Sequence, residues 1–179
     1  MANQKVLIPA RGTTVETRMM PIQSGATFGV GDFLVMSTTG AVIGAAAGNN
    51  YPAASSINTK IIGRAESPAV DVNTNSANPF VSITKAQPGT EFLLPLYHTT
   101  PASAVPTLSQ LGTKYELRNT SGGWPAVDLT QTTNVIVKVV DFDPADYPAW
   151  PGSYATGSVQ EANVWVEILA SAATLTGAA

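Results

Sequence analysis

Fifteen glycines and thirteen prolines are scattered through this chain of 179 residues, and their spacing constrains the fold more than any other feature. Both residue types interrupt helices, so few stretches are long enough to form an amphipathic helix. Short apolar runs bounded by turn-forming clusters lie between them, which is typical of an all-β sandwich or barrel. We therefore predict a single all-β domain with long loops and extended termini. The predicted strands are KVLIP (5–9), VETRMMPI (15–22), DFLVMS (32–37), AVIG (41–44), TKIIGRAE (59–66), PFVSITKA (79–86), TEFLLPLYH (90–98), KYELRN (114–119), NVIVKVVDF (134–142) and ANVWVEILA (162–170).

Local signals within these runs predict particular turns and irregularities. DFLVMS and AVIG are expected to form a hairpin around Thr38 to Gly40. Gly63 lies inside a strand pattern and predicts a bulge or a close approach of another backbone. Pro95 has no N–H group, so TEFLLPLYH is not expected to hold a central position in a sheet along its whole length.

At most one short helix is predicted, near Thr107 to Leu111. Thr107 is a suitable N-cap and Gln110 follows three residues later, which together form a capping box. Leu108 would share a face with Leu111, and Gly112 supplies the left-handed residue that ends the helix.

The predicted core follows the alternating or double-faced apolar runs. We divide the chain into an N-terminal arm with the first strands (1–24), a β domain (25–169) and a C-terminal tail (170–179). The predicted core residues are Phe33, Val35, Ile62, Phe92, Leu94, Val135, Val137, Val139, Val164, Val166 and Ile168.

Charge and cysteine content exclude several classes of function. Charged residues make up 12% of the chain and the net charge is −3, so no basic face for nucleic acid or anionic lipid is expected. No cysteine is present, which excludes disulfides and zinc sites built on thiolates. The start of the chain is too short in apolar residues for a signal peptide, and no window approaches the roughly 18 to 20 apolar residues of a membrane span. We expect no membrane partner and synthesis in the cytoplasm.

Catalytic signals are weak, and we predict neither an enzyme nor a cofactor. His98 is the only histidine, and it follows a strand as a loop or turn residue would. The glycines Gly25, Gly29 and Gly31 do not fit a dinucleotide-binding loop, because the third glycine of that motif would fall at Leu34 within a strand. We interpret them as a turn that enters the strand.

Three acids near the end of NVIVKVVDF are the best candidates for a metal site. Asp141, Asp143 and Asp146 offer carboxylate oxygens of the kind that calcium prefers. The spacing departs from a calcium-binding loop, which has a glycine where Asp146 stands and a glutamate where Gly152 stands. We therefore predict no metal. In this interpretation Val135 to Val140 form a buried strand and Asp141 and Asp143 mark its exit.

Two groups of residues are candidates for contact with a partner protein. Aromatic residues next to prolines crowd predicted surface loops, where they either form an interface or fold back over the ends of the barrel. The apolar N-terminal arm is suited to adding a strand to a neighbour's sheet edge. The candidate contact residues are Lys5, Val6, Leu7, Ile8, Arg11, Trp124, Tyr147, Trp150 and Tyr154.

Five stretches of the chain resemble small virion proteins of tailed bacteriophages. They are GATFGVGDFLVMSTTGAVIG (25–44), TKIIGRAES (59–67), GTEFLLPLYHT (89–99), LSQLGTKYELRN (108–119) and TNVIVKVVDFDPADY (133–147). In that family the Gly31-Asp32 pair leads into a strand, an IGRAE-type strand follows, and an LG-x-x-Y-x-L step and a V-x-V-x-x-x-D strand come near the end. The likeness spans roughly residues 25–169.

The resemblance implies a capsid decoration, or cement, protein. Such a protein is expected to be a homotrimer on the outer surface of the virion capsid, where it binds the major capsid protein and bridges neighbouring capsomers. The alternatives are a head-fibre or carbohydrate-binding module, in which Trp150, Tyr154 and Asp146 would form the sugar site, and a tail-tube or tail-completion protein.

Overall fold

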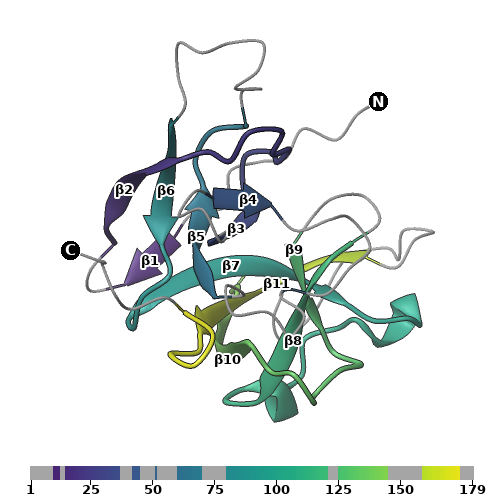
Figure 1. Cartoon of the computed structure of the whole chain (residues 1–179). Coiled ribbons are helices and arrows are strands. Elements are labelled where there is room, and N and C mark those ends of the chain that lie inside the picture. The colour runs from purple at the N-terminus through teal and green to yellow at the C-terminus, as the bar shows by residue number, and fades with distance from the viewer. Residues whose placement is uncertain are drawn as a thin grey trace.

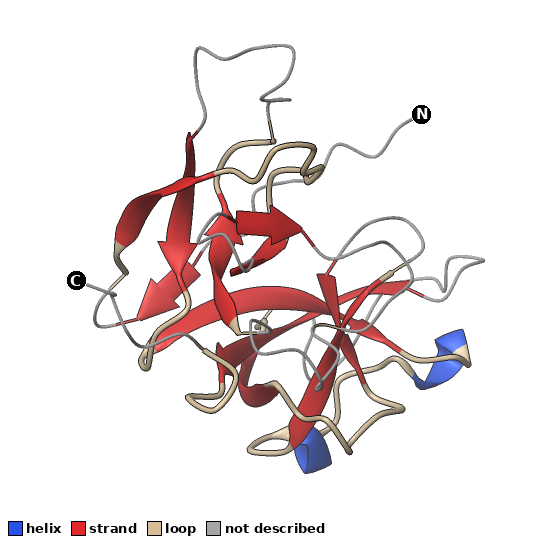
Figure 2. Cartoon of the chain, in the orientation of Figure 1, coloured by secondary structure: helices blue, strands red, loops and turns tan. Residues whose placement is uncertain are grey.

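The computed structural model describes residues 10–12, 15–36, 42–44, 51, 60–69, 80–120, 125–144 and 159–173. Within these ranges the chain is almost entirely β, as predicted, and its strands form a six-stranded and a five-stranded sheet (Figures 1 and 2). No helix in the described part is long and apolar enough to cross a membrane. The elements are β1 (Ala10–Gly12), β2 (Thr17–Pro21), β3 (Phe33–Met36), β4 (Val42–Gly44), β5 (Ile61–Ala65), β6 (Phe80–Lys85), β7 (Thr90–Tyr97), η1 (Pro101–Ser103), η2 (Leu108–Gln110), β8 (Lys114–Asn119), β9 (Pro125–Asp128), β10 (Val137–Phe142) and β11 (Val159–Ile168).

The six-stranded sheet closes into a barrel. Its order is β1-β7-β11-β10-β8-β9, and a parallel pairing of β9 with β7 closes the ring from β7 to β9, with β1 beside β7 as an additional strand. Strand β7 therefore shares one edge between two neighbours, with β1 beside residues 90–92 and β9 beside residues 96–97. Pro95 lies between these two pairings, on the part of the edge that has no neighbour among the described strands. Its lack of an N–H group therefore costs the sheet no hydrogen bond. The prediction that this strand would not be central along its whole length is confirmed.

The barrel interior is filled by alternate residues of its strands. Thr90, Phe92, Leu94 and Leu96 of β7 all point inward and are buried, as expected for a period of two. Phe92, Leu94 and Leu96 meet inward residues of β8, β10 and β11 in one hydrophobic cluster. Figure 1 shows β7 as a long, curved strand that crosses the barrel.

The five-stranded sheet, ordered β2-β6-β5-β3-β4, packs on the barrel and has a core of its own. Successive residues of β3 and β5 alternate between the two cores. Phe33 and Ile61 belong to the barrel cluster, whereas Leu34 and Ile62 belong to the second cluster with Val81 and Ile83. All five residues of β5 are consequently buried. A strand covered on both faces has no polar side to alternate with, which explains why Ile61 and Ile62 follow one another in TKIIGRAE.

At Gly63 the backbone of β6 leaves no room for a side chain on β5. A Cβ added there would lie 2.3 Å from the carbonyl oxygen of Thr84, too close for any side chain. The register between β3 and β5 also shifts at this point, because Leu34 pairs with Gly63 and Val35 pairs with Ile61. Both forms of the prediction for Gly63, a bulge and a close approach, are confirmed.

Several other predictions about elements are confirmed and some are wrong. The pairing of β3 with β4 is confirmed, and the predicted turn at Thr38 to Gly40 lies outside the described residues. The predicted helix is a 3-10 turn, η2, in which Thr107 N–H donates to Gln110 Oε1 at 3.0 Å and Gly112 has a left-handed φ of 77°. A second short turn, η1, was not predicted.

Of the predicted core residues, Val135 is wrong, and Val35 packs against the barrel core from its margin. Val35 and Val135 are only half-buried, while the other nine are buried. Val135 precedes the strand, because β10 begins at Val137 and Ile136 turns inward in its place. The strand also continues beyond Val140 to Phe142, so Asp141 lies within it and does not mark its exit.

Candidate functional site

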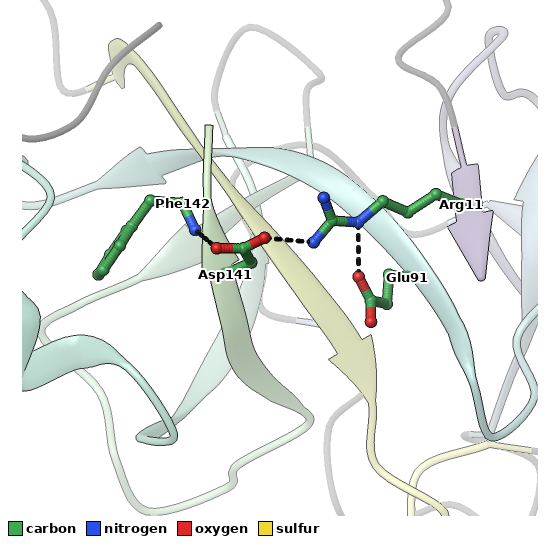
Figure 3. A network of polar contacts seen from close by, with 4 residues as sticks. All are labelled: Arg11, Glu91, Asp141 and Phe142. Atoms are coloured by element: carbon green, nitrogen blue, oxygen red, sulfur yellow. Dashed lines mark hydrogen bonds and ion pairs between the residues drawn. The ribbon is translucent and has the colours of Figure 1, made fainter. Parts of the chain in front are cut away.

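The main polar cluster on the barrel surface is centred on Arg11 and joins four strands. Arg11 Nε donates to Glu91 Oε2 at 2.7 Å, and Arg11 Nη2 donates to Asp141 Oδ2 at 2.7 Å (Figure 3). The guanidinium carbon lies 4.1 Å from the centroid of the Trp165 ring. We call Arg11, Glu91, Asp141 and Trp165 the Arg11 cluster. It crosses the sheet from β1 over β7 and β11 to β10, and so fastens the edge strand β1 to the barrel.

A β-bulge places Asp141 in this cluster. Val139 pairs with Val166 and Asp141 pairs with Trp165, so Val140 is skipped. Without the extra residue, Asp141 would follow Val137 and Val139 toward the core. The bulge turns its carboxylate to the outer face instead, and Phe142 takes the inward position. Phe142 N–H then donates to Asp141 Oδ1 at 2.9 Å and helps to hold the carboxylate in place (Figure 3).

Each contact in the Arg11 cluster is weak on its own, and together the contacts hold β1 against the barrel. The side chains of Arg11, Glu91 and Asp141 are 41%, 28% and 54% exposed, so each ion pair contributes at most about 1 kcal/mol in water. Stacking of the guanidinium on Trp165 adds about 0.5 to 1 kcal/mol. These contacts matter locally, because β1 has only three residues in its ladder with β7.

Arg11 also governs the titration of Asp141. The hydrogen bond from Arg11 lowers the pKa of Asp141 below its ordinary value of 3.8, although partial burial opposes this. A carboxyl whose pKa is lowered by folding contributes stability above its unfolded pKa and loses it as the pH falls through the folded pKa. The fastening of β1 should therefore hold above about pH 4 and weaken below it.

Replacing Arg11 with glutamine should raise the pKa of Asp141 toward 3.8, because the charged donor is lost while most of the side chain remains. The measurement is an NMR titration that follows the Asp141 carboxyl carbon in wild type and in Arg11→Gln. Lys85→Gln is a matched control, because Lys85 pairs with Glu16 at 2.8 Å on the other sheet. An Asp141 midpoint that stays the same in Arg11→Gln would contradict this role.

Of the three acids at the predicted strand end, the structure describes Asp141 and Asp143. Asp141 is bound by Arg11, Asp143 lies just after β10, and Asp146 lies outside the described residues. Within the described part of the chain, no group of three His, Asp or Glu side chains is placed to hold a metal ion.

His98 lies in a turn after β7. Its Nδ1 accepts the backbone N–H of Thr100 at 2.9 Å, so the ring closes the turn locally. This position agrees with the interpretation of His98 as a turn residue and gives no support to a catalytic role.

Most of the predicted contact residues lie outside the described ranges. Of that set, only Arg11 is described, and it fastens β1 to the barrel. The others, all outside the described residues, are Lys5, Val6, Leu7, Ile8, Trp124, Tyr147, Trp150 and Tyr154.

A second surface feature was missed by sequence reasoning. Val15, Met19 and Phe80 are 47%, 56% and 46% exposed, although large apolar side chains are normally covered. Met19 and Phe80 lie on one side of the β2–β6 pair, because Met19 pairs with Ser82 and Pro21 pairs with Phe80, and Val15 lies just before the start of β2. We call these three residues the β2 face. Alternation in VETRMMPI places Val15 and Met19 on one side of the strand, but it does not tell which side faces water.

Comparison with known proteins finds no matching family model, no matching curated protein and no matching solved structure.

Proposed function

We propose that this chain is a structural virion protein that binds the outer surface of a tailed-bacteriophage capsid and stabilises it by bridging capsomers. Its partners would be the major capsid protein and two further copies of itself in a homotrimer. The observation that carries the proposal is the β2 face, an exposed apolar surface on the outermost strand of a sheet. Such a surface is suited to contact with another protein.

The resemblance to small phage virion proteins is a second argument for the proposal. The stretches that carry it contain β3, β5, β7, β8 and β10, which belong to both sheets. The likeness therefore includes strands of both sheets, whereas β1, β2, β6, β9 and β11 lie outside the stretches.

Stabilisation of a shell requires no chemistry. A protein that binds the assembled shell and not its separated subunits shifts the equilibrium toward assembly by mass action. Three linked copies raise the effective concentration of each weak contact, so a trimer can hold the shell firmly with modest interfaces. The low charge of the chain limits repulsion between many copies at close spacing.

The alternative is a head-fibre or carbohydrate-binding module. Sugars stack on exposed aromatic rings beside acids and amides, and Trp165 has two acids nearby. However, the guanidinium of Arg11 already covers the Trp165 ring, and a sugar would have to displace it. Binding through the Arg11 cluster is therefore disfavoured relative to contact through the β2 face.

Two binding measurements separate these functions. We expect the purified protein to co-sediment with assembled heads of the phage that encodes it, and to give no signal above background on a glycan array. Glycan binding without capsid binding would instead support the fibre function. Binding to tails but not to heads would support the tail-completion function.

A further inference from the structure

Within the described part of the chain, no strand pairs with the outer edge of β2. Among the described strands, β2 pairs only with β6, which makes it an edge of the five-stranded sheet. Lys85 N–H donates to Glu16 O at 2.9 Å, so this pair is a hydrogen-bonded one in the antiparallel ladder. Hydrogen-bonded pairs recur at every second residue, which directs the polar backbone groups of Arg18 and Met20 toward β6. Those of Thr17 and Met19 consequently point away from the sheet.

This edge is short and only partly protected. Edge strands are usually guarded by charged residues, prolines or bulges, because their unpaired backbone groups otherwise recruit other chains. Pro21 closes one end of the row, and the Glu16–Lys85 ion pair lies near the other. Between them remains a stretch of backbone beside the apolar β2 face, where a short extended segment would gain both hydrogen bonds and apolar contact.

The sequence before β1 has the composition that fits this edge. Residues 5–9, KVLIP, place Val6 and Ile8 on one side of an extended segment and Lys5 and Leu7 on the other. Val6 and Ile8 match the apolar character of Met19 and Phe80. Pro9 has no N–H, so a ladder formed by this segment would end before β1 begins at Ala10.

The direction of the chain favours a second copy as the acceptor. The chain runs from β1 through residues 13–16 into β2, so residues 1–9 join β1 at the end farther from β2 along the chain. The Arg11 cluster fixes β1 to the barrel at that point. To reach the β2 edge of its own chain, the segment would have to reverse at Pro9 and run back past β1.

We propose that residues 5–8 of one copy add as a strand to the outer edge of β2 in a second copy. The donor segment and the acceptor edge are different surfaces, so the contact is head-to-tail and closes into a ring when the rotation allows it. The inference rests on the homotrimer of the proposed function and names its contact. It does not require that the trimer bind a capsid.

Cross-linking tests the contact directly, because the chain has no native cysteine. We would mix the single variants Val6→Cys and Thr17→Cys, the second carrying a size tag, and treat them with a short bismaleimide. Thr17 is exposed at the β2 edge. A tagged heterodimer on a denaturing gel is expected. Leu111→Cys, which replaces an exposed apolar side chain just after η2, is the matched control for Thr17→Cys. If Val6→Cys gives as much heterodimer with Leu111→Cys as with Thr17→Cys, the proposal is overturned.

The double variant Val6→Cys/Thr17→Cys distinguishes the occupant. Linked dimers and trimers are expected when every chain carries both cysteines. A product that migrates only as an internally linked monomer would mean that the segment covers its own β2, which overturns the assignment to a second copy.

A charge on the edge provides an independent readout. Met19→Lys should weaken self-association by about tenfold or more, because the ammonium group would be desolvated in the covered face. The fold should persist, because Met19 is 56% exposed. Leu111→Lys is the control and should leave the association unchanged. If Met19→Lys abolishes capsid binding and leaves the trimer intact, the shell protein occupies β2 and the proposal is wrong. Two results together support the proposal, whether or not the wild-type protein binds capsids. Met19→Lys loses the trimer, and Val6→Cys forms cross-links with Thr17→Cys but not with Leu111→Cys.

Discussion

Replacing Phe92 with alanine is expected to lower the free energy of unfolding by about 3 to 5 kcal/mol. Phe92 is completely buried and lies where the two sheets meet. Its ring packs edge-on against Phe33, with centroids 5.0 Å apart, and the guanidinium of Arg64 lies 5.6 Å from its centroid. Alanine would leave a cavity that both the barrel and the second sheet border. Denaturant unfolding followed by tryptophan fluorescence measures the loss.

Phe80→Ala is the matched control for this prediction. It makes the same chemical change at a ring that is 46% exposed on the β2 face. The expected loss is within about 0.5 kcal/mol, as for most surface substitutions. Losses of similar size in the two variants would contradict the placement of the core between the sheets.

Gly63→Ala is expected to be the other strongly destabilising substitution, although it adds a single methyl group. The new Cβ would lie 2.3 Å from Thr84 O, 3.0 Å from Thr84 C and 3.1 Å from Ile83 Cδ1. The nearest two of these atoms belong to the backbone of β6 and cannot rotate away, so β5 and β6 must separate. Overpacking of this kind costs about 1 to 3 kcal/mol, and we expect the upper part of that range. The midpoint of thermal unfolding is the measurement.

Gly25→Ala separates steric crowding from backbone strain. Gly25 has a φ of 75°, but an added Cβ there would meet no atom within 4 Å. Its cost should be that of the left-handed conformation alone, about 1 kcal/mol. If Gly63→Ala proves no more harmful than Gly25→Ala, the close approach of β5 and β6 is incorrect.

Period-two patterns and glycine positions were sufficient to predict the all-β class and many of the strands. The strand around Gly63 and the turn ended by Gly112 are recognisable because only glycine suits a close approach or a left-handed φ. The limits of β10 were misjudged, because a bulge at Val140 breaks the alternation on which the prediction rested. A strand's pattern shows where side chains alternate, but not where one residue is skipped.

The candidate surfaces were harder to predict than the fold. Arg11 meets Asp141 across 130 residues of sequence, and this contact depends on sheet order and register. No local pattern determines these. The sequence predicts that Trp165 lies in a strand. Its contact with Arg11 depends on the order of strands in the barrel, which the sequence pattern does not show. The β2 face was missed for a related reason, since the alternation of Val15 and Met19 is the same whether that side faces water or protein.

The central claim is that this chain stabilises an assembled capsid by contact, and a heating experiment tests it most directly. Heads of the encoding phage that lack the protein would be heated with and without added purified chain, and the temperature at which DNA becomes accessible to a dye would be recorded. The proposal predicts that the wild-type protein raises this temperature in a saturable manner and is found as a trimer on the shells. It also predicts a smaller rise for the chain without residues 1–9. A protein that stays monomeric at micromolar concentration, does not bind the heads at any salt concentration and leaves their release temperature unchanged would contradict the claim.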